Sequence, residues 1–302
     1  MSEPRGSDPR LYIDENITIH EGEEAARLLE ARTAQGAVDP RSGVARVDRA
    51  RWEEAQRYER RTWMRNGRRT LSDRNESHRD HFARYAVLRG LHFKKAIELG
   101  CGPFTNLRFI LPKCRIDDVT LLDPLIQDYL SHPFCRYRGG RLGGLFHETP
   151  ARLPVYLLHP LRALRSKTND MRAGGFLGRP VTLVRSTIES FETTERFDLV
   201  VMVNVLEHCH DAYAVLAKID EILAPGGVFV YHDKMYDAVG IGRLMAAVYD
   251  AGHPLRVDQS VVDAFLQARF TPLFRAVHPV HQEFRGLRLD HEDLYYIGRR
   301  NS

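Results

Sequence analysis

The chain has few cysteines and no long apolar run. Its four cysteines, Cys101, Cys114, Cys135 and Cys209, show no CxxC spacing, which excludes the dense disulfide framework of small secreted domains. The first ten residues lack the apolar core of a signal peptide, and no run approaches the ~18 apolar residues of a membrane span. We therefore expect a soluble cytoplasmic protein without a membrane partner. Lysine is scarce beside arginine, which suggests a GC-rich bacterial genome.

A strong net charge is also absent. The 44 basic and 40 acidic residues give +4, which is too little to indicate a nucleic-acid-binding protein. The charge is unevenly distributed, because Arg136 to Arg179 holds nine basic residues and two acidic ones, a net +7 that leaves −3 for the rest. Arginine binds carboxylates and phosphates well. This segment could select an anionic acceptor, and a solvated loop with helix is the alternative.

With 302 residues, the chain can form one large domain, or a core domain with an appendage. From residue 94 onward apolar runs alternate with helical patterns, which is typical of a doubly wound α/β fold. We expect a mostly parallel seven-stranded sheet in residues 93–302, an N-terminal helical lid in residues 1–92, and an insertion at about 131–179 between the second and third strands. The strands are expected at 96–99, 119–122, 181–184, 197–203 and 228–231, with a closing antiparallel pair near 273–277 and 294–297, and lid helices at 48–64 and 72–88.

The stretch from Lys95 to Asp123 organises this domain. A short apolar run ends in the turn sequence GCGP, a helix follows from near Thr105, and a second apolar run ends at Asp123. An acid roughly 20 residues after a nucleotide-binding glycine turn is placed to hold ribose hydroxyls. Gly100, Cys101 and Gly102 with Asp123 therefore predict a nucleotide-binding edge.

The charge of Glu98 helps to identify the cofactor. Glu98 ends the first strand beside the glycine turn, where its carboxylate would repel a pyrophosphate and attract a cation. S-adenosylmethionine carries an ammonium and a sulfonium group and no phosphate, so it fits this turn better than NAD or FAD. A phosphate-binding turn is the competing interpretation.

Four segments resemble, in order, the motifs of one enzyme family. AIELGCGP, TLLDP, FDLVVMVNVLEHCHD and LAPGGVFVYHD are similar to those of the Rossmann-like (class I) S-adenosylmethionine-dependent methyltransferases, over about Lys94 to Asp233. Two positions depart from the pattern, since Phe104 replaces a third glycine, and Ser186 with Thr187 stands where the family often has an acid near adenine.

The resemblance implies a cofactor site. It implies S-adenosyl-L-methionine as cofactor and S-adenosyl-L-homocysteine as product. The methionine part would lie among the glycine turn, the ribose on Asp123, and adenine beside Thr187 or Ile188. The implied cofactor residues are Glu98, Gly100, Cys101, Gly102, Asp123, Pro124, Thr187, Ile188 and Asn204.

Methyl transfer from a sulfonium is a direct displacement, so the protein mainly has to align two reactants and exclude water. A base helps where the acceptor is a hydroxyl, and histidine suits this task at neutral pH. His208 follows the fourth strand, whose carboxyl end faces the ligand crevice in such sheets, and His232 follows the fifth. They are the candidate catalytic residues, and packing or helix capping by His208 is the alternative.

No metal site is expected. Glu207 and His208 are adjacent, so their side chains tend to diverge, and no second ligand cluster is evident elsewhere. A resemblance to methyltransferases whose Glu-His pair binds magnesium leaves the metal alternative open.

Five further residues are candidates for contact with the acceptor or the lid. Trp63, Arg74 and His78 lie in the predicted lid, where aromatic packing and a solvated charged face are the alternative. His253 and Arg256 follow the fifth strand, in a segment that often borders the acceptor in this fold, and a plain turn is the alternative there.

The sequence thus predicts a methyltransferase that acts on an oxygen or nitrogen of a small metabolite. An anionic sugar or peptide natural product is one form of that acceptor, and such a role belongs to biosynthesis. Two alternatives stay open: an RNA methyltransferase that grips phosphates with the basic insertion, although no RNA-binding module is recognisable, and a non-catalytic cofactor-binding module.

Overall fold

The computed structural model describes residues 17–19, 27, 43–65, 75–103, 105–131, 181–237, 240–241, 244, 248–281, 283–284, 287–288 and 290–301. Most of the predicted basic insertion, together with Arg74 and Phe104, lies outside these residues. In the part of the chain that the structure describes, no helix is long and apolar enough to cross a membrane.

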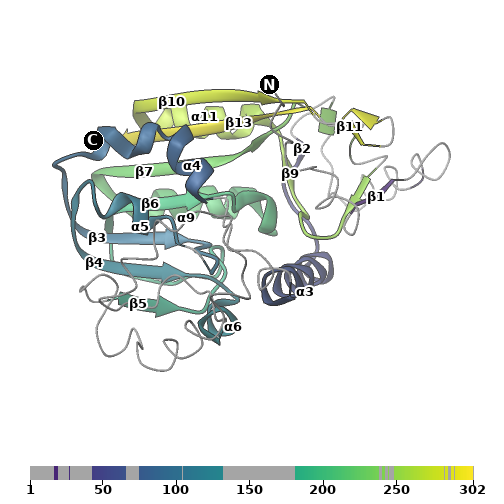
Figure 1. The fold of residues 1–302 in the computed structure, drawn as a ribbon, viewed down its shortest axis with the longest axis horizontal. Helices are drawn as coiled ribbons and strands as arrows, with labels where there is room; N and C mark the ends of the chain where they lie inside the picture. Colours follow the sequence, from purple (N-terminus) through teal and green to yellow (C-terminus); the bar gives the residue numbers. More distant parts are fainter. Residues whose placement is uncertain are drawn as a thin grey trace, which may run out of the picture.

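A seven-stranded sheet forms the centre of the molecule, as the sequence predicts (Figure 1). Five neighbouring strands are parallel, and β13 and β10 extend the sheet as an antiparallel pair. In sheet order the strands are β10 (Phe270–Val280), β13 (His291–Arg300), β7 (Leu223–Met235), β6 (Phe197–Val203), β3 (His92–Leu99), β4 (Arg115–Leu122) and β5 (Val181–Val184).

The order of the parallel strands locates the ligand edge. The chain runs outward from β3 through β4 to β5 and then returns to β6, on the other side of β3. The direction of winding therefore reverses between β3 and β6. In open α/β sheets, ligands bind at such a switch point, outside the carboxyl ends of the strands.

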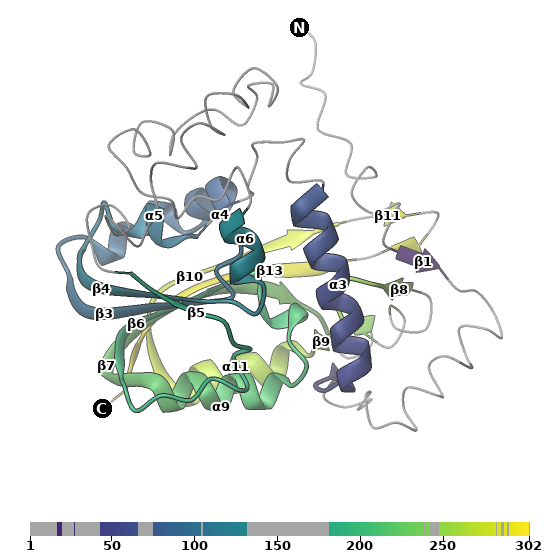
Figure 2. The same cartoon turned by 90° about the horizontal axis from the view of Figure 1, so that it is seen from below.

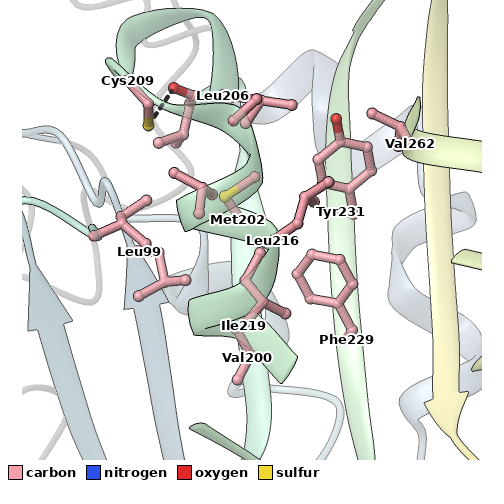
Figure 3. Packing of buried hydrophobic residues seen from close by; sticks show 14 of the residues in the cluster. Leu99, Val200, Met202, Leu206, Cys209, Leu216, Ile219, Phe229, Tyr231 and Val262 are labelled. Atoms are coloured by element: carbon pink, nitrogen blue, oxygen red, sulfur yellow. Dashed lines mark hydrogen bonds between the residues drawn. The ribbon is translucent and has the colours of Figure 1, made fainter. Parts of the chain in front are cut away.

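Helices cover both faces of the sheet (Figure 2). One face carries α9 (Ala212–Ile222) and α11 (Gln259–Arg269), and the other carries α4 (Asn75–His81), the 3₁₀ helix η2 (Ala83–Leu88) and α5 (Leu107–Ile110). Figure 3 shows how α9 buries its apolar stripe: Leu216 and Ile219 face the side chains that β6 and β7 present. This packing makes β6 a rigid support for the loop that follows it.

The prediction of one continuous helix at 72–88 is wrong. The chain leaves the α-helical conformation after α4, and Ala83, Arg84 and Tyr85 have φ of 48°, 56° and 57°. This turn brings Phe82 and Tyr85 into the core, where both are fully buried with ring centroids 4.9 Å apart.

The N-terminal segments pack against the end of the sheet domain. Helix α3 (Arg49–Arg65), predicted at 48–64, lies beside the carboxyl ends of the parallel strands (Figure 2). The Trp52 indole N–H donates to the carbonyl of His208 at 3.2 Å, and Arg60 pairs with Asp128 at 2.9 Å. Asp128 belongs to the short helix α6 (Ile126–Ser131).

Short strands join these N-terminal segments to the region after β7. β1 (Ile17–Ile19) pairs with β8 (Val248–Asp250), and β2 (Gly43–Val44) pairs with β9 (Arg256–Val257), both antiparallel. A last hairpin joins β11 (Glu283–Phe284) to β12 (Leu287–Arg288).

Candidate functional site

The glycine turn after β3 brings three strand ends together. Gly100 and Gly102 have φ of +65° and +53°, a region that glycine enters without steric cost. A Cβ on Gly100 would lie 2.5 Å from a methyl carbon of Val205, which follows β6, and the Gly100 N–H donates to the Leu122 carbonyl of β4 at 2.8 Å. A side chain at position 100 would therefore push the β6 loop away from the turn.

Asp123 is a buried carboxylate at the end of β4. Only 6 % of its surface is exposed, and its oxygens accept the N–H groups of Gly102 at 3.0 Å and Leu125 at 2.7 Å. Burial raises the pKa of Asp123 to about 6, although both N–H donors lower it. A carboxylate has about four acceptor sites, so this one has capacity for further donors. Ribose hydroxyls can donate to these free acceptor sites, so the residues present are suited to S-adenosylmethionine.

Glu98 is a buried carboxylate at the end of β3. The side chain is 1 % exposed. Its carboxylate accepts the Asn106 N–H at 2.8 Å, the Asn106 amide at 3.1 Å, the Leu107 N–H at 3.4 Å and the Thr105 hydroxyl. Burial raises the pKa of Glu98 while these bonds oppose the change. Glu98 therefore lies beside the glycine turn and anchors the start of α5 from inside.

The other predicted cofactor residues also follow strand ends, with different exposures. Cys101 is buried and its N–H donates to Leu122, and Pro124 is partly buried after β4. After β5, the Thr187 hydroxyl accepts the Ser190 N–H at 3.2 Å, and Ile188 is buried in the core.

Asn204 and Asp233 shape the loop after β6. Asn204 has φ +59°, and its N–H donates to the His232 carbonyl at 2.8 Å. Asp233 follows in β7, and its carboxylate accepts the N–H groups of Val205 at 3.1 Å and Leu206 at 2.6 Å. Burial, and then the charge of Glu207, raise the pKa of Asp233 to about 7. The Asp233 carboxylate and the His232 carbonyl therefore hold the loop after β6 in place.

His208 lies where the β6 loop meets the lid helix. It ends the 3₁₀ helix η4 (Leu206–His208), and its Nδ1 is 3.1 Å from the Gly252 carbonyl and 3.8 Å from Glu59 Oε1. The His253 ring is stacked obliquely beside it, with centroids 4.6 Å apart. The structure therefore brings together the predicted residues His208 and His253.

A buried ionic network supports these histidines. Glu207 is 2.7 Å from the Lys234 ammonium and 3.5 Å from the Arg256 guanidinium. Asp250 accepts from Arg256 and from His253 Nδ1, both at 2.7 Å. Burial alone would raise the pKa of both acids, but the cationic neighbours, led by His253, hold the pKa of Glu207 and Asp250 well below the usual range.

Sequence reasoning missed Glu59 and Asp250. Glu59 is one of many charged residues of α3, and no local pattern distinguishes it. Asp250 lies in a segment whose pairing with β1 is not visible in the sequence. Only the docking of α3 and of the segment after β7 brings them to His208, so no sequence signal could have found them.

His232, the second catalytic candidate, is enclosed. It is 1 % exposed, Nδ1 is 2.9 Å from the Leu294 carbonyl, and the ring stacks on Tyr295 at 4.2 Å. Burial lowers the pKa of His232 to about 4, so the ring is neutral at neutral pH. The arrangement favours His208 as a base over His232.

The two lid residues that the structure describes lie apart. The Trp63 indole N–H donates to Glu59 Oε2 at 2.8 Å, which places it beside the His208 cluster. His78 belongs to α4, where Nδ1 is 3.1 Å from the Tyr295 hydroxyl and the ring centroid is 4.4 Å from that of His232.

Comparison with known proteins identifies one matching family. A family described as "Methyltransferase domain" matches residues 55–257. No match to the chain was found among curated proteins.

Solved structures of similar fold include two N-methyltransferases. One is N-methyltransferase NodS from Bradyrhizobium japonicum WM9 with S-adenosyl-L-homocysteine, at 17 % identity over 75 % of this chain and 87 % of that chain, with a TM-score of 0.44. The other is 1,6-didemethyltoxoflavin-N1-methyltransferase from Burkholderia thailandensis, at 16 % identity over 100 % of both chains, with a TM-score of 0.41.

Proposed function

The chain belongs to the methyltransferase domain family and uses S-adenosylmethionine as its methyl donor, and from this premise we propose that it methylates an oxygen or nitrogen of a small metabolite. We further propose that residues 1–92 act as a lid over the acceptor side and that residues 93–302 form the catalytic domain. His208 is the proton acceptor in this proposal.

The observation that supports the proposal best is the meeting of two sets of residues at the switch point. The glycine turn and Asp123 lie at the ends of β3 and β4, while His208 follows β6 on the other side of β3. Asp123 would hold the ribose of the donor, and the turn would hold its amino-acid part. The bound donor supplies an electrophilic methyl group, and the chain aligns the acceptor with it.

His208 suits the role of proton acceptor by its position. Its side chain keeps 18 % exposure, so an acceptor can reach the ring. The Gly252 carbonyl on Nδ1 orients the imidazole, as a base in acid–base catalysis must be oriented. The lid helix contributes Glu59 and Trp63 to the same place, which would exclude water from the displacement.

The basic segment from Arg136 to Arg179 suggests an anionic acceptor. Its net +7 stands against −3 in the rest of the chain, and arginine recognises carboxylates and phosphates through paired N–H donors. An anionic sugar or a peptide natural product would meet this requirement.

The proposal is tested with two histidine variants. His208→Gln should lower turnover by about a hundredfold, because general-base catalysis contributes roughly that much, with donor affinity unchanged in calorimetry. His210→Gln is the matched control, because His210 lies two residues further on beside Glu189, at 3.7 Å, and should retain turnover. Turnover is measured as labelled methyl transfer to fractionated small-molecule extracts. If His208→Gln keeps full activity, His208 is not a base, and the protein promotes the reaction only by aligning the reactants.

A further inference from the structure

Three potential metal ligands from three separate segments meet beside the β6 loop. Glu59 comes from α3, His208 from η4, and His253 from the loop between β8 and β9, and one ligand atom of each lies within 4.8 Å of the others. We propose that these residues bind a divalent first-row transition-metal ion of the zinc type. The proposal is independent of which acceptor is methylated.

The spacing and exposure suit an ion. Ligand atoms at about 2.0–2.2 Å from a tetrahedral metal lie roughly 3.4 Å from one another. Side-chain rotations alone can bring the three ligand atoms, which lie within 4.8 Å of one another, to this distance. The side chains of Glu59, His208 and His253 are 15 %, 18 % and 20 % exposed. They are enclosed enough to be held in position and open enough for an ion to enter from solvent.

Each ligand is already held by an outer partner. Asp250 accepts from His253 Nδ1 at 2.7 Å, and the Gly252 carbonyl is 3.1 Å from His208 Nδ1. His253 Nε2, which lies 3.4 Å from Glu207 Oε1, is then the ring nitrogen of His253 that would bind an ion, whereas in His208 the nitrogen 3.8 Å from Glu59 Oε1 is Nδ1. The Trp63 indole N–H donates to Glu59 Oε2 at 2.8 Å, and Oε1 is the oxygen nearer His208. Metal-binding histidines usually donate their other N–H to a carboxylate or a carbonyl in this way.

The local charge favours a cation. Around the two histidines lie three carboxylates, Glu59, Glu207 and Asp250, and two cations, Lys234 and Arg256. Lys234 pairs with Glu207, and Arg256 pairs with Asp250. Glu59 is therefore the carboxylate whose charge an added cation would compensate.

The donor set indicates the class of metal. Imidazole nitrogen suits zinc, copper, iron and nickel, whereas magnesium, calcium and manganese prefer oxygen ligands. Two histidines and one carboxylate also leave at least one coordination position open. An oxygen of the methyl acceptor would fit there.

The ion would have two effects on the proposed reaction. It would join the lid helix to the β6 loop, because Glu59 and His208 belong to different elements. It would also occupy a ring nitrogen of His208. With the ion bound, the acceptor hydroxyl would lose its proton to solvent because the metal lowers its pKa, whereas His208 acts as the base of the proposed function when the ion is absent.

The test is metal binding by the full chain without an affinity tag. Because the chain carries 14 histidines, stoichiometry alone is insufficient and variants are needed. The stripped protein is titrated with Zn²⁺, Mn²⁺ and Mg²⁺ in a calorimeter, and Co²⁺ absorption reports the coordination. We expect one tight equivalent of Zn²⁺, with weaker Mn²⁺ binding and weak Mg²⁺ binding.

Two ligand variants and one control decide the assignment. Glu59→Gln and His253→Gln should each weaken the tight equivalent by about tenfold or more, while His210→Gln should bind as the wild type does. Donor binding by each variant, measured separately, reports that the fold is retained. Absence of a tight equivalent in the wild type, or equal affinity in all variants, would overturn the metal proposal and leave the methyltransferase proposal standing. Methyl transfer that resists complete chelation would favour the imidazole as base.

Discussion

At the scale of single residues, Asp123 links the pH dependence of stability to donor binding. Its folded pKa of about 6 lies above the usual 3.8, so the folded state binds the proton more tightly than the unfolded state does. The contribution of Asp123 is therefore most favourable below about pH 4 and is lost as the pH rises through about 6. Two pKa units correspond to about 3 kcal/mol.

The Asp123→Asn variant isolates this contribution. Between pH 4 and 7, the unfolding free energy of the wild type should fall relative to that of Asp123→Asn, because only the wild type acquires a buried charge over this range. Donor affinity of the wild type should rise over the same interval, since the ionised carboxylate is the better acceptor of hydroxyls. Chemical denaturation and calorimetry at several pH values measure both. If this stability difference does not change with pH, Asp123 does not titrate in this range.

Glu98 is expected to contribute stability more than donor affinity. Glu98→Ala would leave several donors of the α5 start without their acceptor in a buried site, at a cost of about 1–3 kcal/mol for each unpaired group. Glu195→Ala is the matched control, because its exposed pair with Lys95 at 2.7 Å is screened by solvent and should contribute little to stability. Urea denaturation compares the two. Similar losses would contradict the anchoring role.

These two residues show how far the sequence could predict the site. The spacing of the glycine turn and Asp123 is local, so the strand–turn–helix pattern was sufficient to place them. The role of Glu98 was not predictable, because the direction of its carboxylate depends on the turn that follows. Glu59 and Asp250 act through contacts between distant segments, which no local pattern encodes.

At the scale of elements, alternation of apolar runs predicted the strands well, while the lid was predicted only in part. Each core strand is a short buried run, and burial on both faces makes such strands easy to find. The predicted helix 72–88 is interrupted where Ala83, Arg84 and Tyr85 have positive φ, and no local pattern in the sequence marks this turn.

The docking of α3 should depend on Trp52 and little on Arg60. Trp52 is buried and donates to the His208 carbonyl, so Trp52→Ala should cost about 3–5 kcal/mol and speed hydrogen exchange in residues 49–65. Arg60→Ala removes an exposed pair with Asp128, which solvent screens, so the loss of stability should be small. Mass-spectrometric hydrogen exchange compares them. Equal protection of α3 in both variants would show that the helix is held by other contacts.

At the scale of the whole molecule, the site depends on segments from both ends of the chain. β1 pairs with β8 and β2 with β9, so the N-terminal region and the region after β7 are joined next to the residues around His208. The family match over residues 55–257 spans the core of this arrangement. What the sequence could not supply is this long-range pairing, because two-residue strands carry no periodic signal of their own.

The uneven charge of the molecule gives the last prediction. Changing Arg136, Arg138 and Arg141 to Glu reverses part of the net +7 and should raise the Michaelis constant of an anionic acceptor by about tenfold or more, since each charged contact contributes ~1 kcal/mol or more. Donor affinity should not change, because Asp123 and the glycine turn lie on other segments. Steady-state kinetics with both substrates measures the two effects.

A second variant and an RNA assay distinguish the possible explanations of that result. Changing Lys94, Arg115 and Arg196 to Glu alters the charge equally at the opposite, amino-terminal edge of the parallel strands and should leave the acceptor's Michaelis constant near the wild-type value. A gel shift of bulk RNA at low salt that the insertion variant abolishes would favour RNA as the acceptor, because phosphate contacts dominate such binding. Equal loss of donor and acceptor binding in the insertion variant would mean misfolding, and the charge would then have no role in recognition.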